Sequence, residues 1–257
     1  MTLPLPPFSA NLGFLWRDLP LADAVAAAAE AGFAAVEAHW PYAEDPRALR
    51  AALQAAEMPL ICINTRRGDV AAGDMGLSAL PDRKSEAMEA VEEAIAFAAT
   101  AGARHVHVMA GRAEGRRAHQ AFLGLLEQAA NLGQRHGIGV LIEPLNAIDV
   151  PGYFLNTTDQ AAALLAELGR DEVRLMFDCY HAQISEGDLT RRLECRLPLI
   201  GHVQIAAVPS RAEPDEGEVA YGRLLRHLWR LGYQGYVGAE YRPRTHTAAG
   251  LGWLTEL

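Results

Sequence analysis

The feature that most constrains the fold is a regular alternation of short apolar runs with alanine- and leucine-rich helical stretches. Short continuous apolar runs are typical of parallel strands that are covered on both faces. We predict eight strands, at Phe8–Leu12, Ala34–His39, Leu60–Asn64, His105–Ala110, Gly139–Glu143, Val173–Asp178, Ile200–Ala206 and Tyr236–Tyr241. We predict helices near Leu21–Ala31, Arg47–Glu57, Lys84–Ala101, Arg117–His136, Thr158–Leu168, Leu189–Arg196, Val219–Leu231 and Thr247–Leu254.

Eight strand–helix units in 257 residues predict an α/β protein, a single-domain (β/α)8 TIM barrel that spans residues 1–257. An open, doubly wound sheet would show the same alternation. Two features favour the barrel. No predicted strand is followed by a glycine-rich dinucleotide fingerprint, and polar residues follow the strands throughout the chain. Only a closed barrel brings all of those strand ends to one mouth.

The charge balance excludes several classes of protein. A formal net charge of −9 argues against nucleic acid and against anionic membrane surfaces as partners. The three cysteines have no paired spacing, which favours a reducing compartment. The N-terminal segment has no basic leader, and no apolar stretch approaches the roughly 20 residues of a membrane helix. We therefore expect a cytoplasmic protein that acts on small molecules, and the sequence leaves a homo-oligomer open.

Four polar side chains follow four of the apolar runs: Glu143, Asp178, Gln204 and Glu240. A carboxylate at the end of a buried strand loses hydration, and charge or hydrogen bonds must compensate. Each of the four, taken alone, has a plainer interpretation as a polar group that anchors a loop or a strand. Together they supply only oxygen ligands, which Mg²⁺ and Mn²⁺ prefer. We predict that the four bind one such divalent ion and leave coordination positions for substrate oxygens.

An ion of this kind suits isomerisation chemistry. When it binds two adjacent oxygens of an α-hydroxycarbonyl compound, it stabilises the enediolate that forms once a carbon-bound proton leaves. Glu143 and Glu240 are the predicted proton-transfer residues, one on each side of the substrate. His181, three residues after Asp178, is either a packing histidine or a second polar group at the same mouth.

Several segments read IEPLNAIDVPGYFLNTTDQA, DCYHAQISEGDL, IGHVQIA and YVGAEYRPR. They resemble the hydroxypyruvate isomerase family of the xylose-isomerase-like TIM barrels, and so do FSANL and AAVEAHWPY. The resemblance implies an aldose–ketose-type isomerase that interconverts hydroxypyruvate and tartronate semialdehyde, with 2-oxo-tetronate isomerase or ketose 3-epimerase as alternatives. It implies the same two proton-transfer residues and the same four metal ligands, and it implies His181 and Arg211 as substrate contacts.

Other residues near the predicted mouth have open or plain interpretations. Because this substrate class carries a carboxylate, the guanidinium of Arg211 can bind it with two parallel hydrogen bonds. Glu37 and His39 either line the pocket or serve as hydrogen-bond partners inside the barrel. We interpret His105 and His107 as interior packing histidines.

The loop after the third strand departs from the family pattern. It reads NTRRGDV, where relatives tend to have asparagine, an apolar residue, proline and then glycine–aspartate–tryptophan. Arg66 and Arg67 either select a more anionic or longer substrate, or pair with local acids such as Asp69 and Asp74.

Competing functions predict other residues. An endonuclease of the endonuclease IV type needs more histidines for a multi-zinc cluster and a basic track for DNA, and the net charge has the wrong sign. Ketose 3-epimerases have a histidine where this chain has Gln204. A scaffold barrel would have no need for the four ligands and would not bind Mn²⁺.

Overall fold

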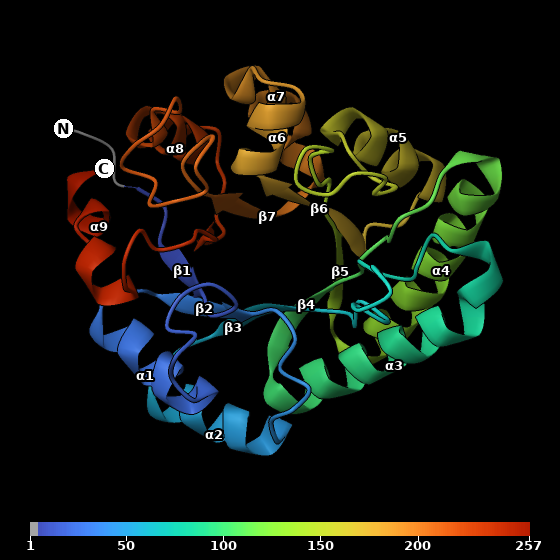
Figure 1. Ribbon diagram of the computed structural model, residues 1–257, viewed down its shortest axis with the longest axis horizontal. Helices are drawn as coiled ribbons and strands as arrows, with labels where there is room; N and C mark the ends of the chain where they lie inside the picture. The colour runs from blue at the N-terminus through green and yellow to red at the C-terminus, as the bar shows by residue number, and fades with distance from the viewer. Residues whose placement is uncertain (1–4) are drawn as a thin grey trace.

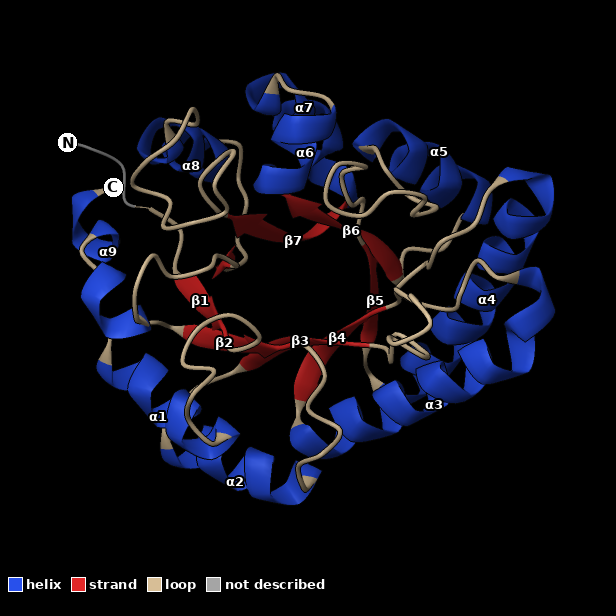
Figure 2. Cartoon of the chain, in the orientation of Figure 1, coloured by secondary structure: helices blue, strands red, loops and turns tan. Residues whose placement is uncertain are grey.

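Eight parallel strands close into a barrel, in which each strand pairs with the next and β8 pairs with β1 (Figure 1). The computed structural model describes residues 5–257. Residues 1–4, which belong to the N-terminal segment in which we expect no signal peptide, lie outside the described residues. The helices surround the ring of strands (Figure 2). The predicted (β/α)8 barrel is therefore confirmed. Within residues 5–257, no helix has the length and apolar character needed to cross a membrane.

The strands alternate with helices along the whole chain. The strands are β1 Phe8–Asn11, β2 Ala35–Ala38, β3 Leu60–Asn64, β4 Ala103–His107, β5 Gly139–Ile142, β6 Val173–Asp178, β7 Ile200–Ile205 and β8 Val237–Ala239. The α-helices are α1 Leu21–Glu30, α2 Pro46–Ala55, α3 Lys84–Ala101, α4 Gly115–His136, α5 Thr158–Leu168, α6 Cys179–Ser185, α7 Leu189–Arg196, α8 Tyr221–Arg230 and α9 Trp253–Glu256. Three short 3₁₀ segments lie at Pro81–Arg83, Leu197–Leu199 and Thr247–Gly250 within the described residues.

Besides shifts of one or two residues at the ends of several other elements, three elements differ from the prediction. β4 begins at Ala103 and ends at His107, earlier than expected, because its pairing with β3 begins at Ala103 and Leu60. The predicted last helix is a 3₁₀ turn followed by the short α9. Helix α6 is new. It begins immediately after Asp178, whose Oδ1 accepts a hydrogen bond from the backbone N–H of Tyr180 at 2.8 Å and so caps the helix.

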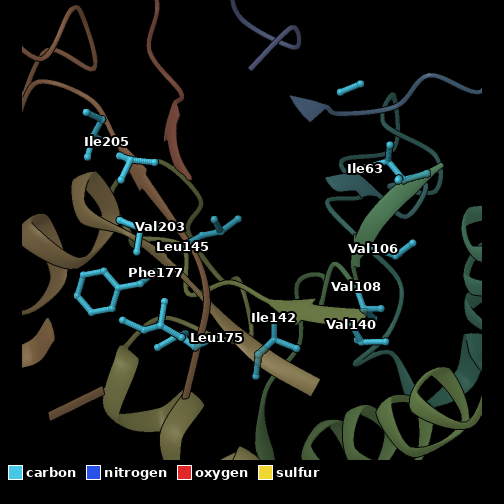
Figure 3. Close-up of a cluster of buried hydrophobic side chains, with 14 of the residues drawn as sticks. Ile63, Val106, Val108, Val140, Ile142, Leu145, Leu175, Phe177, Val203 and Ile205 are labelled. Atoms are coloured by element: carbon cyan, nitrogen blue, oxygen red, sulfur yellow. The ribbon is translucent and has the colours of Figure 1, made fainter. Parts of the chain in front are cut away.

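The main hydrophobic core lies between the strands and the helices. Alternate strand residues point outward into it, including Val106, Val140, Leu175 and Val203 (Figure 3). The inward apolar residues Cys62, Leu141 and Met176 form a small separate cluster inside the barrel. Burial of the outward side chains holds the strands in register and leaves the inward positions free for polar groups.

One inward position requires glycine. A Cβ at Gly238, on β8, would collide with the carboxylate of Glu37 and would lie 2.8 Å from Cγ of Gln204. Gly238 therefore leaves room for polar side chains that reach across the barrel interior from β2 and β7.

Candidate active site

All four predicted ligands lie at the carboxyl ends of β5 to β8. Glu143 directly follows β5, Asp178 ends β6, Gln204 lies near the end of β7, and Glu240 directly follows β8. All four are buried, with exposed fractions of 1–6%. A cavity of about 300 Å³ opens above them, lined in part by Glu143, Glu240, His181 and Arg211. Barrel closure thus brings residues nearly 100 positions apart to one site.

Glu143, Asp178 and His181 form one half of the site. One ligand atom from each lies within 4.8 Å of the others, a spacing that can hold a metal ion. Oε1 of Glu143 and Oδ2 of Asp178 are buried and have no hydrogen-bond partner within the described part of the chain. Oδ1 of Asp178 is already used to cap α6, so the two carboxyl oxygens have separate tasks.

Glu240 and Gln204 form the other half. Oε2 of Glu240 accepts hydrogen bonds from Nδ2 of Asn11 at 3.0 Å and from Nε2 of Gln204. Its Oε1 accepts from Nη2 of Arg211 at 2.9 Å, and Nε2 of His39 lies 3.6 Å from the same oxygen. These contacts fix the orientation of the Glu240 carboxylate, and Arg211 connects it to the cluster of Glu143, Asp178 and His181, because the same guanidinium lies 4.0 Å from Oδ2 of Asp178.

Glu37 fixes the orientation of the Gln204 amide. Glu37 is fully buried, and its carboxylate accepts from Oγ of Ser9 at 2.6 Å and contacts Nε2 of His202 at 2.9 Å. It also accepts from Nε2 of Gln204 at 2.7 Å. Because an ionised carboxylate only accepts hydrogen bonds, the NH₂ group of Gln204 must face it. Oε1 of Gln204 is left buried without a hydrogen-bond partner among residues 5–257.

Three of the four predicted ligands thus present a buried oxygen that no described group satisfies: Glu143, Asp178 and Gln204. A buried polar atom without a partner is costly, and a bound ion is one of the standard explanations for such an atom. Oxygen atoms alone are what a hard divalent cation requires. The residues present therefore fit Mg²⁺ or Mn²⁺ at this position.

Burial and mutual repulsion raise the pKa values of Glu143 and Asp178 in the metal-free site. Burial first, and then the charges of Glu240 and Asp178, raise the pKa of Glu143 well above its ordinary value. Burial and the charge of Glu240 likewise raise the pKa of Asp178 to about 7. A cation bound between them would remove both penalties, since it would replace the lost hydration and offset the repulsion.

His181 is held as a neutral hydrogen-bond donor. Its Nδ1 accepts from the backbone N–H of Asn146 at 3.1 Å, so the ring proton is on Nε2. Burial, followed by the charge of Arg211, lowers the pKa of His181 well below its ordinary value. The Nε2–H lies 3.7 Å from Oδ2 of Asp178 and 4.0 Å from Oε1 of Glu143. In this tautomer Nε2 carries the proton, so it can donate a hydrogen bond but cannot bind a metal.

Arg211 lies deep in the site. Besides Glu240, its guanidinium lies 3.8 Å from Oδ2 of Asp149 and 4.0 Å from Oδ2 of Asp178. It stacks between the rings of Phe14 and Tyr180, each with its centroid 4.9 Å from Cζ. The nearby acids outweigh the effect of burial and raise the pKa of Arg211, so it remains a cation.

The structure decides between the remaining interpretations of residues near the mouth. Of the two β2 candidates, His39 lines the cavity and Glu37 is an interior hydrogen-bond partner. His107, interpreted as a packing residue, lines the cavity with Nδ1 3.5 Å from Oε2 of Glu143. Asn11 and Asn146, which contact the site acids and histidine, were not predicted. Their only signal was that each lies at or just after the end of a strand.

Arg66 and Arg67 have different environments in the structure. Arg66 is not among the residues that line the cavity, and it binds Glu93, with Nη2 donating to Oε1 at 2.8 Å. Its partner is therefore Glu93, and neither Asp69 nor Asp74 as the plainer interpretation expected. Arg67 lines the active-site cavity.

Comparison with known proteins is consistent along nearly the whole chain. A family model for the xylose isomerase-like TIM barrel matches residues 25–257. A 2-oxo-tetronate isomerase of Cupriavidus necator is 44% identical over 254 residues, which cover 97% of this chain and 98% of the relative. A hydroxypyruvate isomerase of Escherichia coli is 35% identical over 251 residues, which cover 96% of this chain and 97% of the relative.

Solved structures agree with this assignment. A Brucella melitensis protein described as an AP endonuclease, family 2, superposes with a TM-score of 0.94 at 39% identity, covering 98% of this chain and 99% of that one. A D-allulose 3-epimerase from Methylomonas sp. has a TM-score of 0.76 at 20% identity over 96% of this chain and 88% of its own, which is a likeness of fold. The chain belongs to the xylose isomerase-like TIM barrel family, beside its hydroxypyruvate and 2-oxo-tetronate isomerases, and it is an isomerase.

Proposed function

We propose that the protein interconverts hydroxypyruvate and tartronate semialdehyde through an enediolate, with a divalent cation, Mg²⁺ or Mn²⁺, in the site. One observation carries the proposal. Oxygens of Glu143, Asp178 and Gln204, from three consecutive strands, are buried without hydrogen-bond partners beside a cavity of about 300 Å³. A hard cation and a substrate rich in oxygen account for that arrangement together.

Four residues would hold the cation: Glu143, Asp178, Gln204 and Glu240. Each presents an oxygen at the carboxyl end of its strand, and Glu37 keeps the amide oxygen of Gln204 free by binding its NH₂ group. When bound, the cation supplies Lewis-acid stabilisation for negative charge that develops on the substrate oxygens. The chain's own residues do the rest.

Glu143 and Glu240, which both line the cavity, move the proton. One carboxylate removes a proton from C3 of hydroxypyruvate, and the electron pair of that C–H bond forms the C2–C3 double bond of the enediolate. The other carboxylic acid delivers a proton to C2, and the C3 oxygen becomes the aldehyde. The hydroxyl proton passes from the C3 oxygen to the C2 oxygen.

His181 and Arg211 assist at fixed positions. The Nε2–H of His181 donates to the substrate oxygen on which charge develops, because Asn146 occupies the other ring nitrogen. Arg211 holds Oε1 of Glu240 at 2.9 Å and so sets the direction from which that carboxylate approaches. Its Nε, buried without a hydrogen-bond partner among the described residues, is free to donate to the substrate.

A second candidate substrate is a 2-oxo-tetronate, which has one more carbon. The 44% identical relative bears that activity in its name, and the same proton transfer between C2 and C3 converts it to a 3-oxo acid. A ketose 3-epimerase is less well supported, because those proteins are similar to this chain in fold at 20% identity. Gln204 also stands where such epimerases are expected to have histidine.

We further propose that the protein works in the cytoplasm on a small molecule, without nucleic acid or membrane as a partner. Cys62, Cys179 and Cys195 are all free thiols, which suits a reducing compartment. The net charge of −9 gives polyanions little to bind.

Proton NMR in D₂O tests the proposed function. With protein and Mg²⁺, deuterium should appear at the hydroxymethyl carbon of hydroxypyruvate, and a chelator should stop the exchange. The same experiment with a 2-oxo-tetronate follows C3. Absence of exchange in both acids would refute the proposal, and exchange that persists in excess chelator would refute the role of the cation.

A further inference from the structure

Arginines outnumber acids around the active-site cavity. Its lining contains two glutamates, Glu143 and Glu240, and four arginines, Arg17, Arg67, Arg211 and Arg242. The chain as a whole has 32 acidic and 23 basic residues, so this excess of positive charge is local. Of the four arginines, only Arg211 forms a salt bridge with an acid of residues 5–257. We call the other three, Arg17, Arg67 and Arg242, the arginine rim.

Arg67 is the best positioned member of the rim. Its Cζ lies 3.8 Å from the centroid of the Trp40 ring, and the indole N–H of Trp40 donates to the backbone carbonyl of Thr65 at 3.1 Å. The indole is therefore a fixed platform under the guanidinium. Arg67 is half-buried, and this burial lowers its pKa. A partly desolvated cation without an acidic partner in the described chain favours an anion that arrives with the ligand.

The neighbouring arginine shows what a structural role looks like in the same loop. Arg66 also lies over an aromatic ring, 4.5 Å from the centroid of Tyr42, but its charge is met by Glu93. Arg66 does not line the active-site cavity, whereas Arg67 does. Two adjacent arginines that both lie over an aromatic ring thus differ in their charge partner, which is a protein carboxylate for Arg66 and no acid of residues 5–257 for Arg67.

The floor of the cavity creates the need for such a cation. Glu143 and Glu240 line the cavity and Asp178 lies next to Glu143, so a substrate carboxylate that enters there is repelled. Arg211 is largely engaged, because its terminal nitrogens contact Glu240, Asp178 and Asp149. The rim lies in the wall of the same cavity and is not engaged by protein acids.

We infer that Arg67, with Arg17 and Arg242 beside it, binds the carboxylate of the substrate and makes the enzyme select 2-oxo acids over uncharged ketoses. This inference rests on the proposed isomerase function. The rim holds the carboxylate at the wall of the cavity, and the two carbons that exchange the proton then lie toward Glu143 and Glu240. Arg67 is a substrate-binding residue in this arrangement, and Arg211 acts on Glu240 and the reacting end.

The test compares Arg67→Met with Arg66→Met, which removes the same charge one residue away from a position outside the cavity. Two substrates are used with the Mg²⁺-loaded protein: a 2-oxo-tetronate, and a ketotetrose that has a hydroxymethyl group in place of the carboxylate. Deuterium exchange at C3 gives kcat and KM for each. Inhibition constants of a tetronate and of a tetritol, which cannot react by this route, give binding alone.

Loss of a charge-assisted hydrogen bond should weaken tetronate binding and raise KM for the 2-oxo-tetronate by about 10- to 100-fold in Arg67→Met. The ketotetrose and the tetritol should change by less than about 3-fold, and Arg66→Met should leave all four values near wild type. Equal weakening of acid and neutral ligands in Arg67→Met, or an equal effect of Arg66→Met, would overturn the inference.

The proposed function fails in a different way. If wild-type protein exchanges neither acid while tetronate binding still depends on Arg67, the anion site stands and the isomerase substrate is wrong. If wild-type protein turns over the 2-oxo-tetronate and Arg67→Met does so with unchanged KM, the function stands and the rim is a solvated surface feature.

Discussion

The outward and inward faces of the same eight strands follow opposite chemistry. Outward residues such as Leu175 and Val203 are apolar and meet the helices in one continuous core. Inward residues from β1, β2 and β7, such as Ser9, Glu37 and Gln204, are polar and bind one another across the barrel. Side chains two positions apart on one strand share a face, so one strand serves both purposes. Stability resides mainly on the outward face and chemistry on the inward one.

The strongest test of this division removes the charge of the inward acids. Glu143→Gln and Glu240→Gln should each lower turnover of the 2-oxo acid by about 10⁴-fold, because each loses a proton-transfer group. The thermal midpoint should change little, since the outward core is untouched. Kinetics by NMR and circular dichroism measure the two quantities. Wild-type turnover in either variant would contradict its assigned role.

The converse test removes an outward side chain. Leu175 is fully buried against the helices, so Leu175→Ala should lower the free energy of unfolding by about 2–5 kcal/mol. The folded fraction should keep its kcat and its affinity for Mg²⁺, as urea titration and steady-state kinetics can show. A lower kcat per folded molecule of Leu175→Ala would mean that the two faces are not independent.

Proton linkage gives a third comparison. The pKa of Asp178 is raised to about 7 in the folded chain, above its unfolded value of about 4, so the folded state binds the extra proton. This contribution to metal-free stability is full below about pH 4 and is lost as the pH rises to about 7. Urea titrations in chelator should therefore show Asp178→Asn gaining on wild type by up to a few kcal/mol across that window.

Saturating Mg²⁺ provides the control for that measurement. Because the cation binds the ionised carboxylate, it should stabilise wild type at pH 7 and leave Asp178→Asn nearly unchanged. A difference between the two proteins that stays constant from pH 4 to pH 7 in chelator would show that the Asp178 carboxyl ionises normally.

The smallest expected effect concerns a residue that never touches the substrate. Glu37→Gln should weaken Mn²⁺ binding by about 10- to 100-fold, because it removes one of the two carboxylates that hold the NH₂ group of Gln204 and keep its oxygen directed to the site. Electron paramagnetic resonance of free Mn²⁺ measures this directly. Ser9→Ala removes another hydrogen bond to the same carboxylate and should leave the affinity within a few fold. Equal losses in both variants would indicate general damage to the interior.

How much could be predicted from the sequence also differs between the outward and inward faces of the strands. The apolar runs predicted all eight strands, because burial on both faces leaves a local pattern in the chain. Asp178, Gln204 and Glu240 were found because each ends such a run. Glu37 was left open and His107 was interpreted as a packing residue, since a single polar residue inside a strand does not reveal which strand faces it. Helix α6 was missed because its start depends on a capping oxygen of Asp178, which had been assigned only to the metal.

Gly238 constrains how the site can change by substitution as well as the shape of the site. An alanine there cannot coexist with the Glu37 carboxylate, and without Glu37 the Gln204 amide keeps only its hydrogen bond to Glu240. A lineage that begins by changing position 238 must break the interior at its first step. A lineage that changes position 37 first passes through a form with weakened metal binding. The two positions therefore have a permitted order of substitution, and descendants that keep the isomerase are expected to inherit both residues together.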